Sequence, residues 1–292
     1  MPRPNLFLIG AMKSGSTTLH ELLAEHPAIC MSEPKEPCFF VDPAVLRERW
    51  PEMWSMGFWR DEAAYLRLFE GKPEAVWRGE SSTDYSKRPR FDGVAERIAA
   101  YSPDARIIYI MRDPVKRSMS HYWHMVEHRG ETRAPLAAIL EDPHYAQVSH
   151  YAMQLRPYLE KFGATRVLSL TFEGLVAEPL QTVKQVYEWL GVDAGFVPPD
   201  PRSARNRTPD EVRQQRKGTQ LLRAFRHSSL WNSIGQRVPK VLRRAGVAML
   251  ERQVQWRKVD TSAAEEHLRR LHRPQIDELT AMLGRSFPEW TT

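Results

Sequence analysis

The sequence predicts an α/β protein with a central parallel sheet that is flanked by helices. Two observations support this prediction. Short apolar runs, typical of buried strands, alternate along the chain with longer segments whose apolar residues recur at helical spacing, and such alternation implies a parallel sheet covered on both faces. The length of 292 residues, with 42% hydrophobic and 27% charged residues, suits one substantial core. We therefore expect a single domain over residues 1–292.

The elements can be assigned in order along the chain. The expected strands are residues 6–9, 28–31, 75–79, 106–111 and 166–172. The expected helices are residues 16–25, 94–101, 114–126 and 180–190. The first helix has Leu19, Leu22 and Leu23 on one face and hydroxyl residues at its start that suit capping. Pro114 suits the first turn of its helix.

Two regions lack this alternation. Residues 32–60 are rich in Pro and Trp, which predicts a loop with short helices. Trp50, Trp54 and Trp59 could line a binding cleft or, as is commoner for Trp, pack in the core. After Pro198 the strand pattern stops, and we expect residues 200–262 to form a basic helical extension of the same domain over the cleft.

The positive charge is concentrated in one segment. Residues 201–260 contain 15 Lys and Arg and four acidic residues, a charge of +11 in a chain of net charge +6, so the remainder carries −5. This asymmetry suggests an anionic partner such as a nucleic acid, a small anionic donor or an acidic glycan. A solvated arginine-rich face explains it equally well, so composition alone does not decide.

Composition also bears on the compartment. No apolar run approaches the roughly 20 residues of a membrane-spanning helix, and residues 6–9 are too short for a signal-peptide core. We therefore expect a cytoplasmic protein. Cys30 and Cys38 are the only cysteines, and we expect both to be reduced thiols.

A phosphate-binding turn is predicted at residues 10–18. The segment Gly10-Ala11-Met12-Lys13-Ser14-Gly15-Ser16-Thr17-Thr18 closes the first strand and opens the first helix. Glycines let backbone N–H groups approach a phosphate, and the helix directs its positive end at the same anion. Lys13 precedes Gly15, whereas the lysine of a nucleotide triphosphatase loop follows its second glycine. The turn therefore indicates a phosphate-bearing donor other than ATP or GTP.

A second anion site is predicted after the strand at 106–111. Arg112 leaves that strand at the edge where ligands of such folds collect, and its guanidinium can hold a phosphate with two hydrogen bonds. Ser120 lies two helical turns further on, within reach of the same anion. A donor with phosphates at both ends of a nucleoside would need two such sites.

These motifs resemble those of sulfotransferases that use 3′-phosphoadenylyl sulfate (PAPS). Residues 9–23 resemble the 5′-phosphosulfate loop, and residues 106–122 resemble the strand and helix that bind the 3′-phosphate. Four further segments of this chain are similar to segments of the heparan-sulfate N- and 3-O-sulfotransferase branch. These are Lys35-Glu36-Pro37-Cys38-Phe39-Phe40, residues 151–158, residues 168–175 and residues 283–287. We therefore expect a bacterial PAPS-dependent sulfotransferase of this type.

The resemblance implies a role for each matching residue. Lys13 would bind the 5′-phosphosulfate and stabilise the leaving phosphate, and Glu36 would be the general base at the acceptor hydroxyl or amine. The residues that would contact the 5′-phosphate are Ser14, Gly15, Ser16, Thr17 and Thr18. Arg112 and Ser120 would hold the 3′-phosphate. The acceptor would be a carbohydrate, lipid or secondary metabolite, and the product would be 3′-phosphoadenosine 5′-phosphate (PAP).

Two segments depart from the family pattern. Many members of the heparan-sulfate branch have a lysine where Ser81 follows Gly79-Glu80, so one cation near the sulfuryl group is missing here. Arg216-Lys217-Gly218 resembles the segment that closes over the 3′-phosphate, although its flanking residues match poorly, and a helix cap on a basic face is the alternative.

Other assignments stay open. His121 and His124 are alternative bases, because histidine suits proton transfer near neutral pH. No metal is expected, since a sulfuryl group in transfer carries less charge than a phosphoryl group and fixed cations can stabilise it. Asp113, followed by Pro114, is a poor match for the magnesium-binding acid of a phosphoryl-transfer enzyme. A P-loop kinase or nucleotidase and a basic nucleic-acid-binding protein are the rival functions, although we expect no nucleic acid partner.

Overall fold

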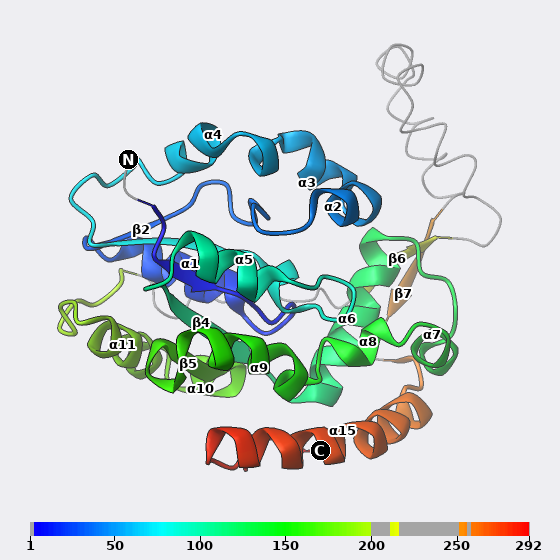
Figure 1. Cartoon of the computed structure of the whole chain (residues 1–292). Helices are drawn as coiled ribbons and strands as arrows, with labels where there is room; N and C mark the ends of the chain where they lie inside the picture. The colour runs from blue at the N-terminus through cyan, green and yellow to red at the C-terminus, as the bar shows by residue number, and fades with distance from the viewer. Residues whose placement is uncertain (1–2, 200–210, 216–250, 256–257, 292) are drawn as a thin grey trace. The chain divides into compact units, whose positions relative to one another are not determined.

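The computed structural model describes residues 3–199, 211–215, 251–255 and 258–291, drawn in colour in Figure 1. Its described residues divide into two compact units. The first unit contains residues 3–118, 144–199 and 268–291. The second contains residues 119–143, 211–215, 251–255 and 258–267. Helices α6 (Pro114–His128) and α15 (Ser262–Leu283) each contribute residues to both. Organisation as a single domain stays a prediction.

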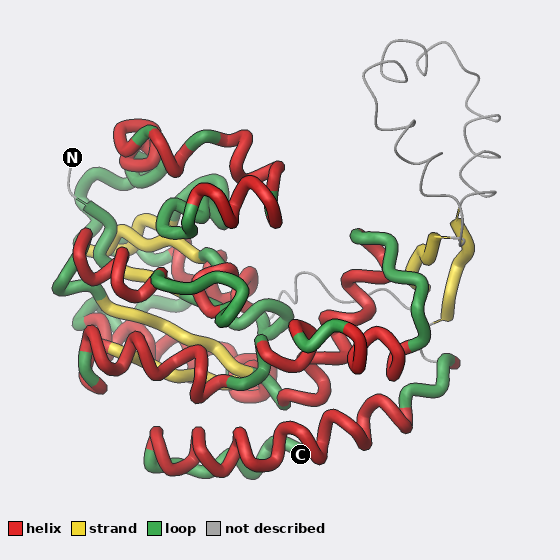
Figure 2. Tube along the Cα trace, turned by 45° about the vertical axis from the view of Figure 1, so that its right-hand side comes forward, coloured by secondary structure: helices red, strands yellow, loops and turns green. Residues whose placement is uncertain are grey.

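The first unit is built on a five-stranded sheet with strand order β2-β3-β1-β4-β5. Figure 2 draws strands in yellow and helices in red. The strands are β1 (Leu6–Leu8), β2 (Ile29–Met31), β3 (Trp77–Ser81), β4 (Arg106–Met111) and β5 (Val167–Thr171). Every neighbouring pair is parallel, with Leu8 opposite Ser81 on one side and Ile108 on the other. The predicted fold class, an α/β protein with a central parallel sheet, is therefore confirmed. The carboxyl ends of β3, β1 and β4 adjoin at one edge, where ligands of such folds bind.

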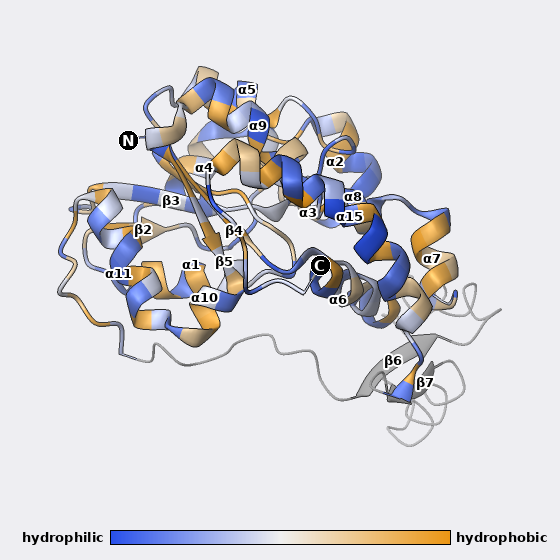
Figure 3. Cartoon of the chain, turned by 90° about the horizontal axis from the view of Figure 1, so that it is seen from below, coloured by the Kyte–Doolittle hydropathy of each residue, from blue (hydrophilic) through white to orange (hydrophobic). Residues whose placement is uncertain are grey.

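Helices cover both faces of this sheet. On one face lie α1 (Ser16–Glu25), α10 (Phe172–Ala177) and α11 (Pro179–Leu190), and on the other lie α5 (Val94–Tyr101) and α9 (Tyr151–Phe162), as Figure 3 shows. The side chains of β1 alternate between the two cores, with Leu6 and Leu8 in one and Phe7 in the other. The central strands β1 and β4 are buried on both faces, and their sequences accordingly are almost entirely apolar.

Short helices also occur in the described residues. The α-helices are α2 (Pro43–Arg49), α3 (Pro51–Met56), α4 (Glu62–Arg67), α7 (Pro135–Glu141) and α8 (His144–Gln147). The 3₁₀ helices are η1 (Phe58–Arg60), η2 (Thr83–Ser86) and η3 (Ala164–Arg166). Residues 32–60 thus form a loop with short helices, as predicted. Their three Trp side chains are partly buried against the core, and Trp54 and Trp59 stack with ring centroids 5.7 Å apart.

Two local expectations differ from the structure. Helix α1 begins after Gly15, whose left-handed conformation makes it the N-cap, and no described side chain caps the helix. Its hydroxyl residues therefore do not cap it as expected. In the basic region, residues Glu211–Gln215 and Glu251–Gln255 form the antiparallel strands β6 and β7, where helices were expected. Two strands that pair across 35 intervening residues leave no local sequence signal.

The second unit also contains α7 and the later part of α6. Here the Glu131 carboxylate accepts hydrogen bonds from the guanidinium of Arg133, which also pairs with Glu141. The Tyr122 hydroxyl donates to the Arg133 carbonyl at 2.8 Å. Among the described residues of the whole chain, no helix combines the length and hydropathy of a membrane span.

Candidate active site

The turn between β1 and α1 (residues 9–15) is held in an unusual backbone conformation. It continues the ladder beside β4, because Ala11 N donates to the Ile110 carbonyl at 2.7 Å and Ile110 N donates to the Gly10 carbonyl at 2.8 Å. Lys13 and Gly15 both have positive φ, at 67° and 87°. A Cβ on Gly15 would lie 2.8 Å from the Phe172 ring. Only glycine fits at that position without strain.

This turn leaves polar groups available to an anion. The Ser14 hydroxyl is fully buried and has no hydrogen-bond partner among the described residues. The start of α1, without a side-chain cap, also offers backbone N–H groups. Buried donors are rarely left unsatisfied in folded proteins, and a helix start favours negative charge. The β1–α1 turn therefore suits a phosphate group, and the contacts of Ser14, Gly15, Ser16, Thr17 and Thr18 with the donor stay a prediction.

Arg112 lies beside this turn. Its Nη1 donates to the Lys13 carbonyl at 3.2 Å, and its guanidinium lies over the Phe172 ring, 4.7 Å from the centroid. Its Nε is buried with no hydrogen-bond partner among the residues that the structure describes. Burial lowers the pKa of Arg112, although the charge of Glu173 opposes this shift. The structure thus brings Lys13 and Arg112, two predicted donor-binding residues, together.

Other predicted donor contacts are not tested. Ser120 lies on α6 as expected, in the second unit, and its contact with an anion at Arg112 stays a prediction. Arg216, Lys217 and Gly218 lie outside the described residues.

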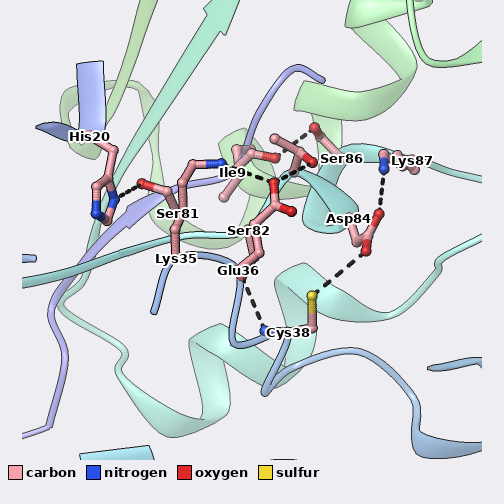
Figure 4. A network of polar contacts seen from close by, with 11 residues as sticks. Ile9, His20, Lys35, Glu36, Cys38, Ser81, Ser82, Asp84, Ser86 and Lys87 are labelled. Atoms are coloured by element: carbon pink, nitrogen blue, oxygen red, sulfur yellow. Dashed lines mark hydrogen bonds and ion pairs between the residues drawn. The ribbon is translucent and has the colours of Figure 1, made fainter. Parts of the chain in front are cut away.

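Glu36 lies in the loop that crosses the carboxyl end of β3 (residues 32–41). The loop is fixed by Glu36 N, which donates to the Ser81 carbonyl at 3.0 Å, and Glu36 itself has a φ of 62°. Its Oε1 accepts hydrogen bonds from Lys35 Nζ at 2.9 Å and from Thr83 Oγ1 at 3.0 Å (Figure 4). The side chain is 31% exposed, so solvent or a substrate can reach it.

The surroundings keep Glu36 ionised. Burial alone would raise its pKa, but the charges of Lys35 and Lys87 and the hydrogen bonds from Lys35 and Thr83 together hold the pKa below its ordinary value. A carboxylate that is charged and accessible can accept a proton from a neighbouring group. Glu36 is thus an ionised and partly exposed carboxylate, and its role as general base stays a prediction.

A buried polar network adjoins Glu36. Lys87 Nζ pairs with Asp84 Oδ1, and the Cys38 thiol donates to Asp84 Oδ2 at 3.6 Å (Figure 4). The Lys87 ammonium also lies over the Trp50 ring. Burial and the negative charge of Asp84 raise the pKa of Cys38 well above its ordinary value. Cys38 therefore stays a thiol. Cys30 is buried as well, and both are free cysteines, as expected.

Ser81, where the sequence departs from the family pattern, contacts a histidine. Its hydroxyl lies 2.8 Å from Nδ1 of His20 on α1 (Figure 4). Burial, and the charge of Lys35, lower the pKa of His20 to about 4, so this imidazole is neutral near pH 7. Among the described residues, the positive charges of Lys35 and Lys87 act on Glu36.

Helix η2 links Glu36 to the β1–α1 turn. Thr83 bonds Glu36, and Ser86 Oγ donates to the Ile9 carbonyl at 2.7 Å (Figure 4). One short segment thus contacts both predicted halves of the site at the same sheet edge. Thr83, which bonds Glu36, and Lys87, whose charge acts on Glu36, were not predicted as site residues. The polar run over residues 81–87, directly after an expected strand, is the signal that could have found them.

The alternative bases lie elsewhere on the chain. His121 and His124 are on α6 in the second unit, where His121 is buried and the His124 ring is 4.6 Å from that of His128. Their candidacy stays a prediction. Among the described residues, no group of three or more His, Cys, Asp or Glu side chains is arranged to hold a metal ion.

Comparisons with known proteins bear on the same segments. The chain is 27% identical over 201 residues to mouse heparan sulfate glucosamine 3-O-sulfotransferase 3A1. The aligned region covers 65% of this chain and 46% of that protein. It is 22% identical over 199 residues to bifunctional heparan sulfate N-deacetylase/N-sulfotransferase 1 of Caenorhabditis elegans, covering 64% of this chain and 22% of that protein. The match thus spans less than half the length of these curated relatives.

A solved structure agrees in fold. The crystal structure of a sulfotransferase from Alicyclobacillus acidocaldarius matches with a TM-score of 0.71 and 28% identity, covering 100% of both chains. The profile of the sulfotransferase family matches residues 4–196, a range that contains the β1–α1 turn, Glu36 and Arg112. These findings confirm the resemblance seen in the sequence. The chain belongs to the sulfotransferase family.

Proposed function

We propose that this chain transfers a sulfuryl group from PAPS to a hydroxyl, or less readily an amine, of a small or polymeric acceptor. The observation that carries the proposal is the pair of features joined by η2: a turn with unsatisfied donors suited to a phosphate, and the ionised, accessible carboxylate of Glu36. Sulfuryl transfer needs an anion site for the donor and a base for the acceptor, and the β1–α1 turn and Glu36, which would supply them, lie at one sheet edge.

The residues divide between donor and acceptor. Lys13 and the segment Ser14 to Thr18 would hold the 5′-phosphosulfate, while Arg112 and Ser120, with Arg216, Lys217 and Gly218, would hold the 3′-phosphate. When bound, the donor supplies the sulfuryl group: its sulfur forms a bond to the acceptor oxygen, its bond to the 5′-phosphate breaks, and PAP leaves. Glu36 would take the acceptor proton, and Lys13 would stabilise the negative charge that collects on the leaving phosphate.

The acceptor class is a carbohydrate, a lipid or a secondary metabolite. The mouse relative named above is a heparan sulfate glucosamine 3-O-sulfotransferase, which favours a carbohydrate hydroxyl. The structural match to the Alicyclobacillus sulfotransferase covers both full chains at 28% identity, which supports a bacterial enzyme. A cytoplasmic location stays a prediction from the sequence.

We further propose that the reaction needs no metal. Lys13, Arg112 and the N-terminus of α1 supply positive charge where the donor's anionic groups would bind. A P-loop kinase, the rival enzyme, needs an acid that holds magnesium. Asp113 is a poor candidate, because both of its carboxylate oxygens accept hydrogen bonds from the protein.

The test is a pair of measurements on the full chain. Thermal shift with PAP is expected to raise the melting temperature more than ATP with magnesium does, since a ligand that binds only the folded state stabilises it. Labelled PAPS should then pass its sulfuryl group to members of an acceptor panel, with and without EDTA. A larger shift with ATP and magnesium would favour the kinase, and salt-sensitive oligonucleotide binding without transfer would favour the nucleic-acid-binding protein.

A further inference from the structure

Residues 287–291, which we call the latch segment, lie against the carboxyl end of β4, which Arg112 directly follows. Phe287 and Trp290 stack with ring centroids 4.1 Å apart, and their side chains are almost fully buried. The family profile ends at residue 196, and no site role follows from the sequence for Trp290 or Thr291. Their polar contacts nevertheless converge on one peptide group of the proposed donor site.

The first contact is with Asp113, which is fully buried. Its Oδ1 accepts hydrogen bonds from the backbone N–H groups of Val115 and Lys116, both at 3.0 Å, and so caps the start of α6. Its Oδ2 accepts from Thr291 N at 2.9 Å and from Thr291 Oγ1 at 2.7 Å. One carboxylate therefore joins the latch segment to the residue that follows Arg112.

The second contact is with Glu173 on α10. Its Oε2 accepts a hydrogen bond from Trp290 Nε1 at 3.2 Å, and its Oε1 accepts one from Asp113 N at 3.0 Å. The N–H of Asp113 belongs to the peptide group that begins at the Arg112 carbonyl carbon. Trp290 thus fixes the carboxylate that holds this peptide.

The third contact is with Tyr151 on α9. The Trp290 ring lies 5.7 Å from the Tyr151 ring. The Tyr151 hydroxyl accepts from Arg112 N at 3.3 Å and donates to the Arg112 carbonyl at 2.6 Å. Both backbone polar groups of Arg112 are therefore held by a side chain that packs against the latch segment.

We infer that Trp290 and Thr291 are positioning residues that fix Arg112 for the 3′-phosphate of the donor through Asp113, Glu173 and Tyr151. The inference rests on the proposed function, since it assigns a task to Arg112 in donor binding. A guanidinium binds a phosphate through two directed hydrogen bonds, so its affinity depends on orientation as well as on charge. A looser backbone at Arg112 therefore weakens PAPS binding, although every residue that contacts PAPS is still present.

The inference is tested by two conservative variants. Thr291→Val removes the hydroxyl, and Trp290→Phe removes the indole N–H but keeps an aromatic ring for stacking. Each is expected to weaken PAP binding about 3- to 10-fold in isothermal titration, because a hydrogen bond to a buried carboxylate is lost. The KM for PAPS should rise similarly while kcat is retained. Thr291→Ser, which keeps the hydroxyl, should bind PAP like the parent.

Matched controls separate this effect from general loss of stability. Thr261→Val also removes a hydroxyl that donates to a carboxylate, on Glu265, at 2.7 Å. Trp189→Phe removes an indole N–H that donates to the Thr165 carbonyl at 3.1 Å. Both are expected to leave PAP affinity unchanged. Melting temperatures of all variants without ligand identify any that fail to fold.

A double-mutant cycle decides whether the latch acts through Arg112. On an Arg112→Ala background, Thr291→Val should cost no further affinity, since the residue that it positions is gone. Additive losses, or latch variants that bind PAP as tightly as their controls, overturn the inference and leave the proposed function standing. If the parent does not bind PAP at all, the proposed function fails and the inference fails with it.

Discussion

The β1–α1 turn and the Glu36 loop lie at the same sheet edge but satisfy their polar groups in opposite ways. In the turn, the Ser14 hydroxyl and the N-terminus of α1 have no described side-chain partner. In the loop, the Glu36 carboxylate already accepts hydrogen bonds from Lys35 and Thr83. The difference suggests that the turn is completed by its ligand, whereas the base is prepared before any ligand arrives. Five substitutions test this contrast.

The largest effect is expected from Glu36→Gln. The amide cannot accept the acceptor proton, so kcat should fall by about 10²- to 10⁴-fold, the usual contribution of a general base. PAP affinity should stay that of the parent, because the loop does not hold the donor phosphates. Glu33→Gln, an exposed acid in the same loop, is the control. Unchanged turnover in Glu36→Gln would transfer the role of base to His121 or His124.

The next effect is expected at the turn and at Arg112 beside it. Lys13→Ala and Arg112→Ala should each weaken PAP binding by about 10- to 100-fold, the loss expected when a charged hydrogen-bond partner of a phosphate is removed. Titration calorimetry measures it, with the exposed Lys161→Ala as control. Parent-like PAP affinity in both variants would show that the donor binds elsewhere.

A smaller effect is expected from Gly15→Ala. The positive φ and the 2.8 Å approach to Phe172 should cost about 1–3 kcal/mol of folding free energy, measured by urea unfolding. PAP binding should weaken as well, since the backbone donors are displaced. Gly71→Ala is the matched control, because a Cβ there meets no atom within 4 Å. Equal stability of the two variants would argue against a backbone-built turn.

The smallest effect at neutral pH is expected from Thr83→Val. Loss of this hydrogen bond raises the pKa of Glu36 toward its ordinary value. The acid limb of the kcat/KM profile should therefore move to higher pH, while activity at pH 7 changes little. Because the folded-state pKa of Glu36 is depressed, its contacts stabilise the fold above the unfolded pKa, and this contribution is lost as pH falls through the folded pKa. Thr165→Val, at an exposed position, should leave the limb in place.

Local sequence patterns predicted most of the sheet but little of the polar network. Strand β4 and helix α5 have the predicted bounds, since a buried apolar run and an amphipathic period are local signals. Local patterns also predicted the turn with Lys13 and the position of Arg112 at a strand end, whereas Glu36 was predicted as a site residue only because its segment resembles a known family. Thr83 is 47 residues from Glu36 and Thr291 is 178 residues from Asp113. Such contacts depend on tertiary structure, which periodicity and capping rules do not encode.

The state of the two thiols has a practical consequence for all of these measurements. Cys30 and Cys38 are the only cysteines of the chain, both are buried, and the pKa of Cys38 is raised. Maleimide reagents attack accessible thiolates, so the folded protein should be nearly inert to them. A cysteine placed at exposed Lys161 would then carry a fluorophore at one defined site without removal of the native cysteines. Ligand binding could be followed by that single label in the otherwise unaltered chain.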